Sequence, residues 1–177
     1  MNLTYYKQNA LCLKSALIKL AKTHGLTLLL AIAFLLTITH RYQLALNLTE
    51  SLPQTLFLID KEDHALARND YFAFRWTQGG PIPNGIIVVK QVKGVTGDVI
   101  GQRIIDKNAY ITINDEPVAK LKARARSGDV LVPIRPTQLT RGEFFAYAPH
   151  PDSLDSRYAL TGVIKASQIV GRAYPLF

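Results

Sequence analysis

The sequence predicts a mostly β, antiparallel domain that follows one N-terminal transmembrane helix. Three observations lead to this prediction: one long uncharged apolar run near the N-terminus, at least six short apolar or alternating runs after it, and turn-forming residues between those runs. The chain has 177 residues, of which 48% are apolar and 19% are charged. It is therefore long enough to bury the core of one domain.

The transmembrane helix is predicted from the run LTLLLAIAFLLTI at 26–38. The 18 residues between Lys22 and Arg41 include no Asp, Glu, Lys or Arg. As a helix they span about 27 Å, close to the bilayer core of about 30 Å. A cleaved signal peptide and a buried core helix are the alternatives. The 24-residue basic head argues against the first, and the lack of a polar face argues against the second, so we expect a retained helix over 25–42.

The distribution of charge predicts the orientation of this helix. Residues 1–24 contain four Lys and no acidic residue, whereas the rest of the chain contains 17 basic and 13 acidic residues. The positive-inside rule then places residues 1–24 in the cytoplasm and residues 45–177 on the far side of the membrane. The net charge of +8 is thus half explained by the anchor, and we expect no nucleic-acid partner.

Cysteine and histidine exclude two further classes of site. The single Cys12 cannot form an intramolecular disulfide, and the four His at 24, 40, 64 and 150 have no metal-ligand spacing. We expect no metal and no cofactor.

The β domain is predicted from short runs rich in β-branched and aromatic residues, separated by Gly, Pro, Asn and Asp. The expected strands are TLFLI (55–59), YFAFRW (71–76), IIVVKQV (86–92), AYITI (109–113), VLVPI (130–134) and FFAYA (144–148). The basic run KLKARAR (120–126) is expected to be a strand as well, with Lys120, Lys122, Arg124 and Arg126 on one face. That face is either a solvated edge or a contact for lipid headgroups or an acidic partner.

Three local features can carry chemistry, although each is ambiguous alone. Ser51 and Pro53 lie directly after the anchor and can form a simple turn. Lys90 lies in an apolar strand, where burial can release its proton and make it a general base; the alternative is an edge-strand lysine that points to solvent. Lys93 is the competing lysine, at the opposite strand parity unless a bulge intervenes. Asp155 and Arg157 follow the Pro-rich segment APHPD and can form a loop ion pair.

Taken together, these features resemble the type I signal peptidase superfamily of Ser/Lys-dyad proteases. The segments that carry the resemblance are Ser51-Leu52-Pro53 after one helix, ARNDYFAFR (67–75), VVKQVKGVTGDVI (88–100), SLDSRY (153–158) and GRA (171–173). One residue, rather than two, separates Ser51 from Pro53. That spacing is most similar to the TraF-type peptidases, which mature the pilin in conjugative transfer.

The resemblance implies a role for each matching residue. Ser51 is expected to be the nucleophile and Lys90 the base, with Ser153 orienting the Lys90 amine. The backbone N–H of Ser51 and the hydroxyl of Thr49 are expected to face the oxyanion. Structural parts are expected for Pro53, Gly94, Gly97, Asp98, Asp155 and Arg157. Residues from about 101 to 140 are expected to form a small β insert in the 45–177 peptidase domain.

The resemblance also implies a function. We expect a serine endopeptidase of the bacterial inner membrane, with a periplasmic catalytic domain, that forms an acyl-enzyme with an exported precursor. A conjugative pilin is the expected precursor, released by water or cyclised by its own amine. The expected partners are this polypeptide, the lipid bilayer and proteins of the conjugation machine. A general leader peptidase, a non-catalytic assembly protein and a LexA-like self-cleaving regulator are the alternatives.

Overall fold

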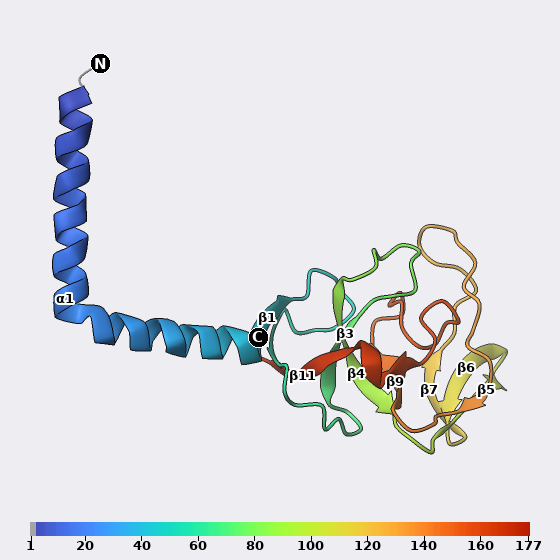
Figure 1. The fold of residues 1–177 in the computed structure, drawn as a ribbon. Coiled ribbons are helices and arrows are strands. Elements are labelled where there is room, and N and C mark those ends of the chain that lie inside the picture. The colour runs from blue at the N-terminus through green and yellow to red at the C-terminus, as the bar shows by residue number, and fades with distance from the viewer. Residues whose placement is uncertain (1–2) are drawn as a thin grey trace. The chain divides into compact units, whose positions relative to one another are not determined.

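The structure is a computed structural model that describes residues 3–177. The chain divides into two units, an N-terminal unit that ends at Arg41 and a domain over Tyr42–Phe177. The first unit is a helix, and the second consists mainly of strands and loops (Figure 1).

The N-terminal unit is the helix α1 (Leu3–Arg41). Its residues Lys22–Arg41 have a mean hydropathy of 1.6, and they are long and apolar enough to cross a membrane. Large apolar side chains between Leu26 and Ile38 are exposed. His40 and Arg41 lie in the last turn, where positive charge favours the helix C-terminus. This helix fits a membrane-anchored protein.

The domain contains two antiparallel sheets, as the sequence predicted. The larger has the order β1-β2-β11-β3-β4-β9-β10 and the smaller the order β7-β6-β5-β8. The strands of the larger sheet are β1 (Tyr42–Leu46), β2 (Leu56–Asp60), β3 (Tyr71–Arg75), β4 (Ile87–Gly94), β9 (Glu143–Tyr147), β10 (Ile164–Lys165) and β11 (Ile169–Pro175). Those of the smaller are β5 (Val99–Ile105), β6 (Asn108–Ile113), β7 (Glu116–Lys120) and β8 (Thr137–Gln138).

Tight turns build the smaller sheet, which lies at the end of the domain away from β1 (Figure 1). Asp106 and Lys107 between β5 and β6 both have positive φ, and so do Asn114 and Asp115 between β6 and β7. Two successive residues of this kind match the right-handed twist of paired strands. Asn and Asp tolerate that conformation best, which accounts for three of these four positions, and Lys107 adopts it as well.

Three apolar clusters form the core. One lies under the smaller sheet around Ile100, Ile111 and Phe145, and two lie on the larger sheet around Phe57 and Ile59 and around Phe72, Phe74 and Trp76. Leu154 packs against both the first cluster and the Trp76 cluster. The loop that carries Leu154 is therefore held between the cores of the two sheets.

Two of the expected strands are wrong. Strand β7 ends at Lys120, so KLKARAR does not form a strand with four basic residues on one face. After Lys120 the chain turns Leu121 into the core, and Lys122 and Arg126 both reach Asp152. The run 130–134 makes only isolated bridges, at Val130 and Pro133, because a proline cannot donate to a ladder.

Candidate active site

The loop between β1 and β2 carries Ser51 and is tied together by Asn47. The side-chain amide of Asn47 donates to the carbonyls of Leu52 and Gln54, 3.0 Å each. Its oxygen accepts from the backbone N–H of Thr49 at 3.2 Å. Leu52 is buried and fixes the middle of the loop, whereas the neighbouring proline is exposed. Asn47 was not predicted from the sequence, because its partners are backbone groups and one hydroxyl.

Within this loop the Ser51 side chain contacts Thr49. The two hydroxyl oxygens are 2.8 Å apart, and the Thr49 hydroxyl is also 2.8 Å from Asn47 Oδ1. The backbone N–H of Ser51 points at the same Thr49 oxygen, at 3.4 Å. The Thr49 hydroxyl thus lies between Asn47 and the hydroxyl of Ser51.

Lys90 lies on β4 with its side chain buried. It is 4% exposed and pairs in register with Phe72 of β3, next to the fully buried Val92. Its Nζ donates to Ser153 Oγ at 2.7 Å. Burial lowers the pKa of Lys90 to about 8; the Asp155 carboxylate acts against this, and the Arg157 guanidinium adds to it. The neutral amine is therefore a minor form, about a tenth, at pH 7, and its share rises to about a half at pH 8.

Lys93, three residues further on, has different surroundings. Its Nζ donates to Asn69 Oδ1 at 3.1 Å and lies 5.8 Å from the centre of the Tyr147 ring. Strand β4 shifts its register against β9 between Val92 and Gly94, at Lys93, and the Lys93 amine bonds to Asn69 and not to Ser153.

The loop after β9 holds Ser153 next to Lys90 through a buried ion pair. Asp155 and Arg157 are 0% and 2% exposed and are joined by bonds of 2.8 and 2.9 Å. Arg157 also donates to the carbonyls of His150 and Ser153. Asp155 accepts from the N–H of Ala148 at 3.0 Å. Burial would lower the pKa of Arg157, but its bonds and charge contact with Asp155 raise it instead.

Asp98 and two glycines shape the turn between β4 and β5. Asp98 accepts from Arg68 with both oxygens at 2.8 Å and from the N–H of Val95 at 2.7 Å. Burial acts to raise the pKa of Asp98, and these hydrogen bonds outweigh it and lower the pKa. Gly97 has φ +93°, and a Cβ on Gly94 would come within 2.9 Å of Phe145. Asp98, Gly97 and Gly94 therefore shape the turn and its packing.

A cleft of about 1370 Å³ brings these segments together. Ser51, Lys90 and Ser153 all line it, with Thr49 beside them. Its remaining walls are mostly apolar over residues 45–48, 80–82, 86–89, 130–132 and 158–160, and a polar part of the lining comes from Glu50, residues 125–127, Asp129, His150 and Asp152. Among the described residues no hydrogen bond joins Ser51 to Lys90: Ser51 is bonded to Thr49, and Lys90 to Ser153. Catalytic bonds often form only once substrate is present.

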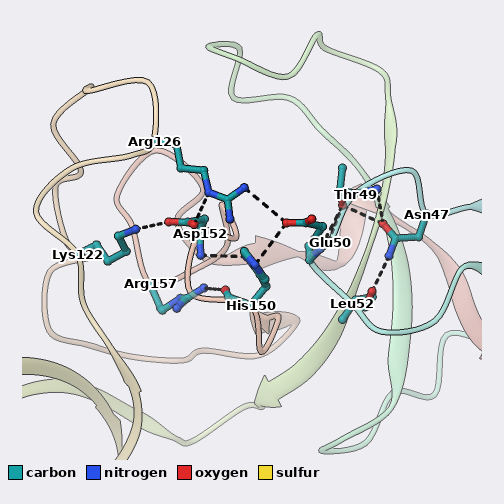
Figure 2. A network of polar contacts seen from close by, with 10 residues as sticks. Asn47, Thr49, Glu50, Leu52, Lys122, Arg126, His150, Asp152 and Arg157 are labelled. Atoms are coloured by element: carbon teal, nitrogen blue, oxygen red, sulfur yellow. Dashed lines mark hydrogen bonds and ion pairs between the residues drawn. The ribbon is translucent and has the colours of Figure 1, made fainter.

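A charged network borders the cleft and was not predicted from the sequence. Asp152 accepts from Lys122 and, at 2.6 Å, from Arg126. The Lys122 bond is the largest cause that lowers the pKa of Asp152. Arg126 also reaches Glu50 at 3.5 Å, and His150 lies 3.6 Å from the same carboxylate (Figure 2). The basic segment therefore contacts the residue next to Ser51.

A family model matches most of the chain. Residues 17–177 match the family model described as signal peptidase, peptidase S26. No curated protein matches the chain. The match covers α1 from its middle onward and the whole of the domain that contains the cleft.

Proposed function

The chain belongs to the signal peptidase family, peptidase S26, and from this premise we propose that it is a membrane-anchored serine endopeptidase with Ser51 as nucleophile and Lys90 as general base. The family implies serine peptidase activity on precursor proteins. The observation that carries the assignment of the two residues is the buried Lys90 amine, whose lowered pKa makes a base available in the wall of the cleft that also holds Ser51.

The proposed first step is attack of Ser51 Oγ on the carbonyl carbon of the precursor, while the neutral amine of Lys90 takes the hydroxyl proton. The backbone N–H of Ser51 is the proposed donor to the resulting oxyanion. The ammonium of Lys90 then gives this proton to the leaving amine, and the C–N bond breaks. A water molecule, deprotonated by the same Lys90, hydrolyses the acyl-enzyme and frees Ser51.

Ser153 and the Asp155–Arg157 pair are proposed to position the base. The Ser153 oxygen accepts from Lys90 Nζ at 2.7 Å, so it restrains a long flexible side chain to one place. The ion pair in turn restrains the Ser153 carbonyl through Arg157, at 3.2 Å. None of these three residues needs to touch the substrate.

The open edge of β4 supports binding of the substrate as an extended strand. β3 pairs with Ile87–Gln91 on one side, but β9 pairs on the other side only from Gln91 onward. In the part of the chain that the structure describes, no strand covers Ile87–Lys90 on that second side. An extended peptide can add there through backbone hydrogen bonds and would bring its carbonyl carbon to Lys90.

The exported precursor is proposed to be a conjugative pilin, processed at the outer face of the bacterial inner membrane. The single residue between Ser51 and Pro53 and the helix α1 support this choice. Water yields a linear product, and the pilin's own amine yields a cyclic one with one water less in mass.

The test is processing of a co-expressed pilin precursor in membranes by the wild type, Ser51→Ala and Lys90→Ala. Processing by the wild type alone is the expected result, and mass spectrometry of the product separates linear from cyclic pilin. Equal processing by all three would mean that another enzyme cuts the precursor. Processing of many exported proteins by the wild type would identify a general leader peptidase instead.

A further inference from the structure

The hydrogen-bond donors around Ser51 can be assigned without ambiguity, starting from Asn47. Its Nδ2 faces the carbonyl oxygens of Leu52 and Gln54, which can only accept. Its Oδ1 faces the N–H of Thr49, which can only donate. The reversed amide would lose all three bonds, so Oδ1 is the atom next to the Thr49 hydroxyl. Figure 2 shows the Asn47 side chain between Thr49 and Leu52.

This orientation fixes the proton of Thr49. A carbonyl oxygen can only accept, so the 2.8 Å contact between Thr49 Oγ1 and Asn47 Oδ1 is a bond that Thr49 donates. A hydroxyl has one proton. Thr49 therefore has none left for Ser51, and the 2.8 Å contact between their hydroxyls is donated by Ser51.

The hydroxyl and the backbone N–H of Ser51, the two donors that catalysis needs, thus both bond to Thr49 Oγ1. Its hydroxyl proton, which the proposed mechanism sends to Lys90, goes to Thr49 at 2.8 Å. Its backbone N–H, the proposed oxyanion donor, points at the same atom at 3.4 Å. Lys90 meanwhile donates to Ser153.

We propose that Asn47 is a positioning residue: by accepting the Thr49 proton it makes Thr49 an acceptor that holds Ser51 in a resting orientation. This rests on the proposed function, because it takes Ser51 as the nucleophile. Substrate binding then releases Ser51 from Thr49, so that the hydroxyl turns to Lys90 and the N–H to the substrate oxygen. Thr49 acts as a resting partner of Ser51 and not as a donor to the oxyanion.

The test is the rate at which Ser51 is acylated by p-nitrophenyl acetate, with the acetylated residue located by peptide mapping of the full-length protein in detergent. Thr49→Val removes the hydroxyl and keeps the shape. The expected rate is higher, by up to about 10-fold, because a competing acceptor worth one hydrogen bond is gone, and an unchanged rate would count against the proposal. A fall of roughly 100-fold would overturn the proposal, since that is the loss expected for an oxyanion donor.

A second comparison separates positioning from support of the loop. Asn47→Ala is measured alone and combined with Thr49→Val, together with the thermal midpoint of each variant. In the wild-type background Asn47→Ala should raise the acylation rate, and in the Thr49→Val background it should leave that rate unchanged. The thermal midpoint should fall in both backgrounds. An equal change of rate in both backgrounds would leave Asn47 with a structural part only and overturn the proposal.

Two controls keep this test apart from that of the proposed function. Ser51→Ala should show no acylation at residue 51, and Lys90→Ala should show slow acylation. If the wild type is not acylated at Ser51, or Lys90→Ala matches it, the proposed function fails and the inference with it. Normal controls with a slow Thr49→Val would reject the inference alone.

Discussion

Two lysines three positions apart on β4 differ in what surrounds them. Lys90 is buried with its amine on Ser153, whereas Lys93 bonds to Asn69. Lys90→Arg should abolish processing, because a guanidinium stays protonated in a protein. Lys93→Ala, the matched control, should retain most activity. Initial rates of precursor processing in membranes measure both, and near-normal turnover by Lys90→Arg would remove Lys90 as the base.

Burial of Lys90 also has an effect on stability that depends on pH. Its pKa falls from 10.5 to about 8 on folding. Between pH 8 and pH 10.5 the Lys90 amine is therefore mostly protonated in the unfolded chain and mostly neutral in the folded one. The contribution of this group to stability therefore rises as the pH goes from about 8 to 10.5, and below 8 it costs about 3 kcal/mol. Lys90→Met should thus raise the free energy of unfolding at pH 7. The gain should not exceed about 3 kcal/mol, because the substitution also removes the bond to Ser153.

Thermal unfolding of the detergent-solubilised protein at pH 7 and pH 10 measures this effect. The gain of Lys90→Met over the wild type should be larger at pH 7. An equal or larger gain at pH 10 would show that Lys90 does not carry the burial cost.

The sequence could single out Lys90 and the Asp155–Arg157 pair as candidates, each ambiguous alone, and only the set of motifs together gave them expected roles. A lysine among valines and an acid two residues from an arginine are readable without a fold. Asn47 is different: its partners are backbone carbonyls and one hydroxyl, and an isolated asparagine in a loop carries no pattern. The contacts of Asp152 join residues up to 30 positions apart, so only the folded chain reveals them.

At the scale of elements, period-two patterns predicted strands where the run was uninterrupted. Residues 55–59 and 86–92 fall on β2 and β4, as expected. The run at 130–134 fails because of Pro133. β11 was seen only as the motif GRA, yet it lies between β2 and β3 in the larger sheet. A short run that contains Gly and ends in Pro gives too weak a pattern to predict a central strand.

Gly171 shows why this strand carries a glycine. A Cβ there would lie 2.0 Å from the backbone oxygen of Asp60, which belongs to β2. Gly171→Ala should therefore force β11 away from β2 and lower the free energy of unfolding by several kcal/mol. Gly101→Ala is the control, because its Cβ would meet only the Thr112 side-chain oxygen, at 2.8 Å. Thermal unfolding compares the two; equal losses would contradict this account of β11.

At the scale of the whole molecule, the domain carries its own core. All three apolar clusters consist of residues from 42–177. Removal of residues 1–41 should leave the free energy of unfolding of the domain within about 0.5 kcal/mol, since no buried group of the domain is lost. Cleavage of a soluble peptide should be unchanged, whereas processing of a membrane-bound precursor should fall, because the anchor raises the local concentration of enzyme and substrate.

Urea unfolding of the 42–177 fragment and of the detergent-solubilised full chain measures the first expectation, and rates on the two substrates measure the second. Ser51→Ala in the fragment and in the full chain gives the background rate on each substrate. Loss of cooperative unfolding in the fragment would show that α1 contributes to the fold of the domain.

The open edge of β4 has a consequence for handling the enzyme. An uncovered strand with Ile87, Val88 and Val89 can pair with the same strand of another molecule as readily as with a peptide. The anchored enzyme can self-associate through β4 only with neighbours in the same membrane. In a concentrated solution of the domain, any two molecules can pair in this way. A peptide that occupies the edge should therefore keep purified domain monodisperse, and a proline at position 89, whose N–H lies on the side away from β3, should reduce both self-association and substrate binding.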